Sequence, residues 1–270
     1  MKNLTAIVLF MLANAMIYAQ STPPAAIAPP SNYQAPTRTF KFKGGLMVSP
    51  FVGWTPVNVD DPTKNSISSK GAQIGFSYGL LGDFFFSNNY GISANLRVSD
   101  FNSEFKYNPG NSGYYTINGQ GANVVSIDRT LHLQYIDLPI TLKMRTNEVG
   151  YMKYFAQFGV MPAVQLGTKG DIDTVSNKPL NGGGSASVTG SVKGLNVTND
   201  VNLFMLYSVI GVGAEYNLGG TTSLVVSITW NNGFTNIWNK KNDNSTANPP
   251  VFSNFNSPEE NISLNLGVLF

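Results

Sequence analysis

The chain contains one histidine, His132, so chemistry that needs an imidazole must be built around it. A histidine acts as a general base when a nucleophile and an orienting group lie within hydrogen-bond reach. Ser208 shares the predicted direction of His132, but the two residues belong to predicted strands that are not neighbours. We therefore predict no catalytic residues and assign His132 to interfacial hydrogen bonding. Cysteine is absent, so we expect neither a metal site nor another cofactor.

A second set of residues that could do chemistry consists of charged side chains at odd-numbered positions within apolar segments. Charges in such surroundings need partners of opposite sign. We predict that they form a polar network inside the fold, with Arg97, Asp137 and Glu215 near its centre and some cations at a rim in water. The predicted members of the network are Lys41, Lys43, Asp83, Arg97, Asp137, Lys143, Arg145, Lys153 and Glu215.

The segments that carry these charges have a period of two residues. In 135–145, Ile136, Leu138 and Ile140 alternate with Asp137 and Lys143. Successive side chains of a strand point to opposite faces, so each segment has an apolar face and a polar face. The pattern predicts eight strands, at 40–54, 72–87, 90–105, 125–145, 151–167, 202–218, 221–231 and 261–270.

The connections between these segments alternate in length. Short turns are expected at 87–91, 146–150 and 218–221, and long polar links are expected at 55–71, 106–124, 168–201 and 232–260. This alternation is typical of outer-membrane barrels, which alone satisfy the backbone of strands in lipid. We predict an all-β fold, an eight-stranded antiparallel transmembrane up-and-down β-barrel. The alternative is a soluble barrel or sandwich, whose exterior would be poorly solvated with only 12% charged residues.

The first residues have the character of a secretory signal peptide. Lys2 precedes an apolar stretch at 6–17, and cleavage is expected after Ala19. Residues 20–39 are rich in Pro and Ala and predict an extended periplasmic tail, followed by the barrel at 40–270. An even number of strands places both termini on the periplasmic side of the outer membrane. The net charge of +2 gives no case for nucleic-acid binding.

The interior of an eight-stranded barrel is only wide enough for its own side chains. We therefore expect the charged network to be a plug, with a small charge-lined channel as the alternative. The last long link contains Phe234, Trp238, Phe252 and Phe255 among Asn and Ser. Exposed aromatic residues can mark a binding surface, and they can equally cap the mouth of the barrel.

The segments "YIDLPITLKMR" (135–145) and "YFAQFGVMPAVQL" (154–166) resemble the hairpin of PorT-like outer-membrane β-barrel proteins of Bacteroidota. "ISLNLGVLF" (262–270) resembles the C-terminal strand that the barrel-insertion machinery reads through a final Phe270. The resemblance covers 40–270 and implies outer-membrane lipid as surroundings and an envelope protein as partner, since one namesake works in type IX secretion. The sequence "DTV" resembles the O-glycosylation sequon of Bacteroidota, with Thr174 as the acceptor.

These observations predict an outer-membrane protein that is not an enzyme. It is expected to act as a membrane scaffold or interaction module, alone or as a subunit of a secretion or envelope complex. Two alternatives are a small channel and a lipid-modifying outer-membrane enzyme built on His132.

Overall fold

The computed structural model describes residues 41–59, 65–109, 114–117, 120–179, 185–239 and 255–270. They all belong to one compact unit, residues 39–270. Within these ranges the chain is almost entirely strand, and the helical structure is limited to the 3-10 turn η1 (Thr198–Asp200). No helix among the described residues is long and apolar enough to cross a membrane.

Eight strands of the barrel wall form a closed antiparallel ring. Two of them are interrupted, one at Asn95 and one at Leu138 and Pro139. The amide of Asn95 donates to the carbonyl of Pro139, which joins the two breaks. Around the ring the strands are β1 (Lys41–Trp54), β4 (Gln73–Phe85), β5 (Tyr90–Ala94) with β6 (Leu96–Pro109), β9 (Ile140–Arg145) with β8 (Gln120–Asp137), β10 (Met152–Pro179), β12 (Phe204–Gly219), β13 (Thr222–Asn236) and β15 (Pro258–Leu269). Because β1 pairs with both β4 and β15, the ring has no open edge.

The two faces of the wall differ as the alternation predicts. On the outside Leu46 and Ile228 are 60% and 55% exposed, whereas Ser77 and Thr229 on the inside are 1% and 4% exposed. The apolar outer side chains form a continuous band around the ring, which we call the apolar belt. The predicted fold class, an eight-stranded antiparallel β-barrel, is confirmed.

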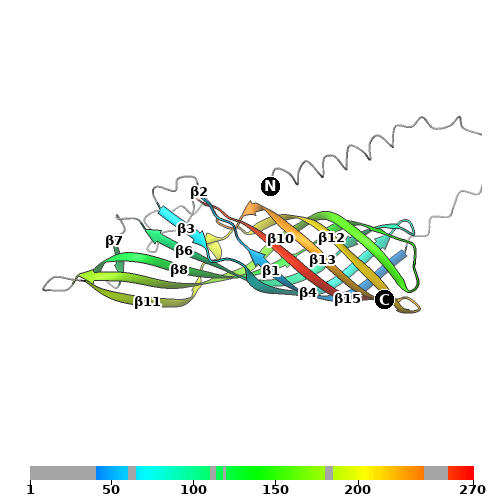
Figure 1. Cartoon of the computed structure of the whole chain (residues 1–270), viewed down its shortest axis with the longest axis horizontal. Coiled ribbons are helices and arrows are strands. Elements are labelled where there is room, and N and C mark those ends of the chain that lie inside the picture. The colour runs from blue at the N-terminus through cyan, green and yellow to red at the C-terminus, as the bar shows by residue number, and fades with distance from the viewer. Residues whose placement is uncertain (1–40, 60–64, 110–113, 118–119, 180–184, 240–254) are drawn as a thin grey trace, which may run out of the picture. The chain divides into compact units, whose positions relative to one another are not determined.

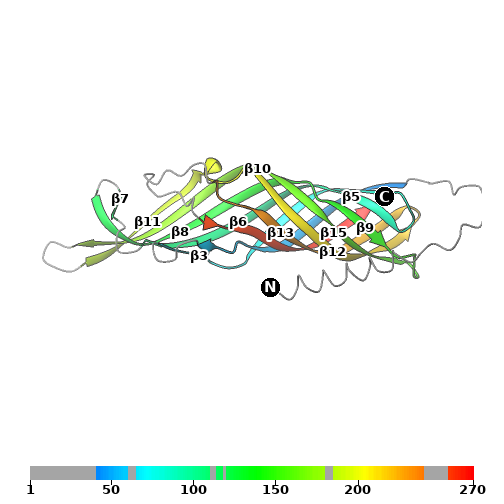
Figure 2. The ribbon, with the colours of Figure 1, turned by 90° about the horizontal axis from the view of Figure 1, so that it is seen from above.

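One side of the barrel continues far beyond the ring, and this was not predicted. The strands β6, β8 and β10 run on without a break, and β3 (Asn65–Ser69), β7 (Tyr114–Ile117) and β11 (Ser185–Asn196) pair with them (Figures 1 and 2). We call this extension the arm. It replaces much of the predicted links 106–124 and 168–201 by strands. The C-terminus lies at the opposite end of the barrel, which we call the turn end (Figure 1).

The remaining two short strands close the arm side of the ring. They are β2 (Asn58–Val59) and β14 (Phe255–Asn256), which pair with each other. The side chain of Ser257 donates to the carbonyl of Pro56, so the ends of the two flanking barrel strands are tied together here.

A β-bulge in β10 changes which side chains face outward. The register against β8 shifts between Gln165 and Gly167. An extra residue in one strand reverses the side-chain alternation beyond it. Leu166 is therefore exposed below the bulge, and Lys169 is exposed above it although its number is odd.

The interior at the arm end is apolar rather than polar. Buried side chains of the wall strands pack together at this end, and η1 and the segment after β13 cover them. The cluster consists of Phe51, Ile67, Phe101, Phe105, Tyr107, Ile127, Leu131, Leu133, Tyr135, Met161, Ala163, Ile172, Val197, Val201, Met205, Tyr207, Val209, Ile237 and Trp238. Odd positions therefore become apolar toward the arm, which the uniform polar face of the sequence prediction did not include.

Candidate functional site

An ion-pair cluster crosses the lumen near the turn end. The ammonium of Lys143 lies 2.6 Å from a carboxylate oxygen of Asp83 and 2.6 Å from one of Glu215. The guanidinium of Arg145 lies 3.4 Å from the second oxygen of Glu215. These four side chains come from β4, β9 and β12, and all are at most 8% exposed. Two cations and two anions compensate each other where water is largely excluded.

Aromatic rings complete this cluster. The guanidinium carbon of Arg145 lies 3.5 Å from the ring centre of Phe85, and the ammonium of Lys143 lies 4.2 Å from that of Phe155. The cations thus face ring π-systems as well as carboxylates, which adds to their stabilisation. Lys43 lies on the same side and donates to the hydroxyl of Ser223 at 3.1 Å.

Two predicted members of the network do not lie in the lumen centre. Lys41 is exposed, because it is the first residue of β1 and stands at the edge of the wall, where the sequence prediction allowed some cations of the network to lie in water. Lys153 is half-buried and pairs at 3.0 Å with Glu148, which belongs to the turn before β10. Glu215 was expected near the centre of the network, and its partners are Lys143 and Arg145.

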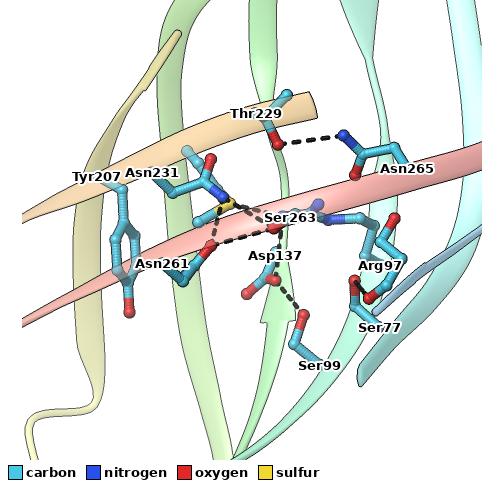
Figure 3. A network of polar contacts seen from close by, with 12 residues as sticks. Ser77, Arg97, Ser99, Asp137, Tyr207, Thr229, Asn231, Asn261, Ser263 and Asn265 are labelled. Atoms are coloured by element: carbon cyan, nitrogen blue, oxygen red, sulfur yellow. Dashed lines mark hydrogen bonds and ion pairs between the residues drawn. The ribbon is translucent and has the colours of Figure 1, made fainter. Parts of the chain in front are cut away.

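A second polar layer lies in the middle of the barrel (Figure 3). Arg97 on β6 lies 3.4 Å from Asp137 on β8, and Ser99 donates to the same carboxylate oxygen. Asp137 and Arg97 stand directly opposite each other in the ladder, which explains why they pair. The guanidinium also contacts the sulfur of Met161 at 2.7 Å.

Hydrogen bonds between amide and hydroxyl side chains on β13 and β15 continue this polar layer on the opposite side of the lumen. Asn231 donates to Asn261 at 2.6 Å, Ser263 donates to the same amide oxygen at 3.1 Å, and Asn265 donates to Thr229 at 3.1 Å (Figure 3). Above them the hydroxyl of Tyr207 donates to Glu259 at 3.0 Å. Sequence reasoning missed Glu259 and Tyr207, because Glu259 precedes the predicted strand and Tyr207 belongs to no polar pattern.

Little space is left between these layers. The cavity between the ion-pair cluster and the middle layer has a volume of about 30 Å³, and the one around Asp137 and Glu259 has about 10 Å³. The first would hold about two water molecules and the second about one. The described lumen is therefore filled by three layers: the ion-pair cluster, the polar layer and the apolar cluster at the arm end.

The four aromatic binding candidates do not form one exposed surface. Phe234 is exposed, but Trp238 is fully buried in the apolar cluster, with its ring centre 5.2 Å from that of Phe105 and 5.2 Å from the guanidinium carbon of Arg129. Its assignment as an exposed binding residue is therefore wrong, and the capping alternative describes its position. Phe252 lies outside the described residues, and Phe255 is placed only through its backbone in β14.

His132 lies on the outside of the wall, at the base of the arm. Its Nδ1 lies 2.7 Å from the amide oxygen of Asn102, and its Nε2 lies 3.3 Å from a carboxylate oxygen of Asp171. Both ring nitrogens thus have a hydrogen-bond partner on a neighbouring strand, Asn102 on β6 and Asp171 on β10. The hydroxyl of Ser208 donates instead to the backbone carbonyl of Asn232 on β13. The sequence did not point to Asp171 because the predicted strand ends at 167, and Asp171 falls in the predicted link 168–201.

Thr174, the glycosylation candidate, lies within β10 rather than in a loop. Its backbone is paired with Gly190 on one side and with Ile127 on the other. Modification there stays a prediction. Among the described residues no group of histidine and acidic side chains could hold a metal ion.

A closed ring of strands with an apolar exterior and a largely polar, packed interior is the arrangement expected of a protein embedded in a lipid bilayer. The sequence model of the family described as outer membrane protein beta-barrel domain matches residues 18–239. The chain belongs to this family. The barrel is thus an outer-membrane barrel, and its apolar belt faces the hydrocarbon of the membrane.

Solved structures of other outer-membrane proteins resemble this barrel. Ail of Yersinia pestis is 12% identical, with 85% of this chain and 99% of Ail covered and a TM-score of 0.33. Neisserial surface protein A is 10% identical, with 83% and 95% covered and a TM-score of 0.35. The outer membrane protease OmpT of Escherichia coli is 10% identical, with 89% and 99% covered and a TM-score of 0.38. A comparison with curated proteins finds no match.

Asp171 lies in the arm, beyond the apolar belt of the barrel, and its ionisation can be followed directly. The amide of Gly194 on β11 donates to it at 2.8 Å, and this bond, followed by the contact with His132, holds the pKa of Asp171 below its usual value of 3.8. A lowered folded-state pKa means that the carboxylate stabilises the arm above pH 3.8, and that this contribution is lost as the pH falls through the folded-state pKa. We expect the NMR signal of the Gly194 amide to titrate with a midpoint below 3.8.

The variant Asp171→Asn is the control for this titration. It removes the carboxylate and should leave the Gly194 amide signal without this transition. A midpoint at or above 3.8 in the unaltered protein would contradict the bond from Gly194 to Asp171.

Proposed function

We propose that this outer-membrane barrel is a closed, non-catalytic scaffold whose arm binds a protein partner outside the cell. The observation that carries the proposal is the lumen, which is packed with three layers of side chains, and two cavities between them have volumes of about 30 and 10 Å³. A hydrated ion path needs a continuous opening, and these two cavities are each too small to be a stretch of such a path. The plug therefore favours a structural role over the alternative of a small channel.

The proposed orientation places the arm on the extracellular side and the turn end in the periplasm. Outer-membrane barrels have short periplasmic turns and longer extracellular connections. The turns at 86–89, 146–151 and 220–221 all lie at the same end as Phe270. In this orientation the C-terminal strand is available to the barrel-insertion machinery from the periplasm, and both termini are periplasmic.

The arm supports a role in binding because its sheet has an open edge. Among the described strands β11 pairs only with β10, and its residues 191–194 are exposed. An unpaired strand edge presents amides and carbonyls that can pair with a strand of another protein. The likeness of 135–166 to PorT-like barrels supports an envelope partner, of which a secretion complex is one case.

Conductance measurements test the closed state. The protein inserted into a planar lipid bilayer should show no stable unitary current under voltages that leave the bilayer intact. The variant Lys143→Ala with Arg145→Ala removes the two cations of the ion-pair cluster and is expected to leak under the same voltages. Reproducible current steps from the unaltered protein would overturn the proposal and favour the channel.

Site-specific photo-crosslinking in intact cells tests the arm. A crosslinker at Ser191 of β11 should capture one protein reproducibly, whereas a crosslinker at Lys41 on the turn end should not capture that protein. Equal capture from both positions, or none from β11, would count against binding through the arm.

A further inference from the structure

A groove of about 860 Å³ lies on the outer wall where the barrel meets the arm. We call it the junction groove. Its half on the barrel side is lined by apolar residues that continue the belt, including Ile74, Phe76 and Leu166. Its half on the arm side is lined by polar residues, namely Asp100, Asn102, His132, Gln134 and Lys169. The groove thus crosses the boundary at which the wall changes from apolar to polar.

The register of the strands arranges the polar half in two rows. Lys169, His132 and Asn102 lie side by side on β10, β8 and β6. The row nearer the belt contains Gly167, Gln134 and Asp100, with Phe76 beside Asp100 on β4. A side chain added at Gly167 would meet no atom within 4 Å, so the missing side chain helps to open the groove.

The apolar half fixes the kind of occupant. Ile74 is 79% exposed, the largest value among the exposed large hydrophobic residues. In an outer-membrane barrel this surface is covered by acyl chains, because no water is present to solvate it and burial in hydrocarbon is favourable. The headgroup that belongs to those chains must then lie against the polar half.

The charges of the polar half select the headgroup. His132 pairs with Asp171, which is not part of the lining, so the opposed charges that line the groove are Asp100 and Lys169. Lys169 has no ion-pair partner within the described part of the chain. A headgroup that carries only negative charge would be attracted by Lys169 and repelled by Asp100. A headgroup with one charge of each sign matches both.

We propose that the junction groove binds a zwitterionic phospholipid of the phosphoethanolamine type, with its phosphate at Lys169 and its ammonium at Asp100. The two residues stand on strands that are two positions apart, about 10 Å across the sheet. The long lysine side chain and the headgroup together span that separation. Charge-assisted contacts at both ends give the preference over a lipid with a single charge. The proposal rests on the location in the outer membrane and not on the scaffold role.

Native mass spectrometry of the full chain in detergent micelles tests this site. The protein is incubated with equal amounts of phosphatidylethanolamine and phosphatidylglycerol that carry the same acyl chains. We expect the ethanolamine lipid to be retained about tenfold more than the glycerol lipid. Lys169→Gln and Asp100→Asn should each lower retention of the ethanolamine lipid about tenfold. Asp100→Lys should shift the preference toward phosphatidylglycerol.

Two further variants separate the groove from general membrane affinity. Gly167→Leu fills the groove without a change in charge and should lower retention of both lipids. Lys41→Gln removes an exposed cation at the turn end and should change nothing. The heat-dependent shift in electrophoretic mobility shows that each variant is folded. Equal retention of the two lipids, unchanged retention in Gly167→Leu, or an effect of Lys41→Gln equal to that of Lys169→Gln would overturn the proposal.

Discussion

Replacement of Lys143 by Met is expected to lower the free energy of unfolding of the barrel by about 3–5 kcal/mol. Lys143 is the only residue seen to pair with Asp83 in the described lumen, and it also contacts Glu215 at 2.6 Å. Methionine keeps much of the volume but leaves Asp83 as a buried carboxylate without a cation. The loss is measured by urea unfolding of the protein in lipid vesicles, followed by tryptophan fluorescence.

The double variant Lys143→Met with Asp83→Asn tests the cause of that loss. It removes the orphaned charge and keeps the pair of Arg145 with Glu215, so it should recover most of the stability. Lys41→Met alters an exposed lysine and should change the free energy by no more than about 0.5 kcal/mol. If the single variant matched Lys41→Met, or if the double variant were no more stable than the single one, the ion-pair cluster would not be a stabilising unit.

Replacement of Trp238 by Ala is expected to cost about 3–5 kcal/mol as well. The indole is fully buried and packs on Phe105, and the guanidinium of Arg129 faces its ring. Its removal leaves a cavity under η1 and takes a π-system away from a buried cation, whose carboxylate partner Asp200 lies at 2.7 Å. Urea unfolding in vesicles again provides the measurement, here followed by the mobility shift because a fluorophore is lost.

Phe234→Ala is the matched control, since Phe234 lies four residues before Trp238, on β13, and is 61% exposed. It should change the free energy of unfolding in the same vesicles by no more than about 0.5 kcal/mol. A loss at Trp238 no greater than that at Phe234 would mean that the arm-end cluster does not help to hold the fold together.

The repeating alternation made the barrel predictable from the sequence. Charged side chains such as Arg97 and Asp137 alternate with apolar side chains along their strands. This pattern fits the wall of a barrel that has lipid on its outer face and a polar interior on its inner face. The pairing of these two residues follows from the same geometry once β6 and β8 are neighbours.

Features that depend on pairing between distant segments could not be read in this way. The bulge at Gln165 and Gly167 reverses the alternation without a signal in composition. Lys169 and Asp171 were not predicted to lie in the wall, because the part of β10 beyond residue 167 was predicted to be a link. The residues of β11 look like a polar link because they are exposed, and only their pairing with β10 makes them a strand. Trp238 was misplaced because the burial of an aromatic residue among Asn and Lys depends on η1, which folds over it.

The unbroken course of β10 has a mechanical consequence. At about 3.3 Å per residue, its 28 residues span about 90 Å from the turn end to the far part of the arm. Apart from the bulge at Gln165 and Gly167, this strand continues directly from the embedded part to the projecting part, and it is paired with β8 from Ala163 to Asn177. A sideways force on the tip of the arm would therefore be transmitted through β10 to the barrel and would tilt the barrel in the membrane.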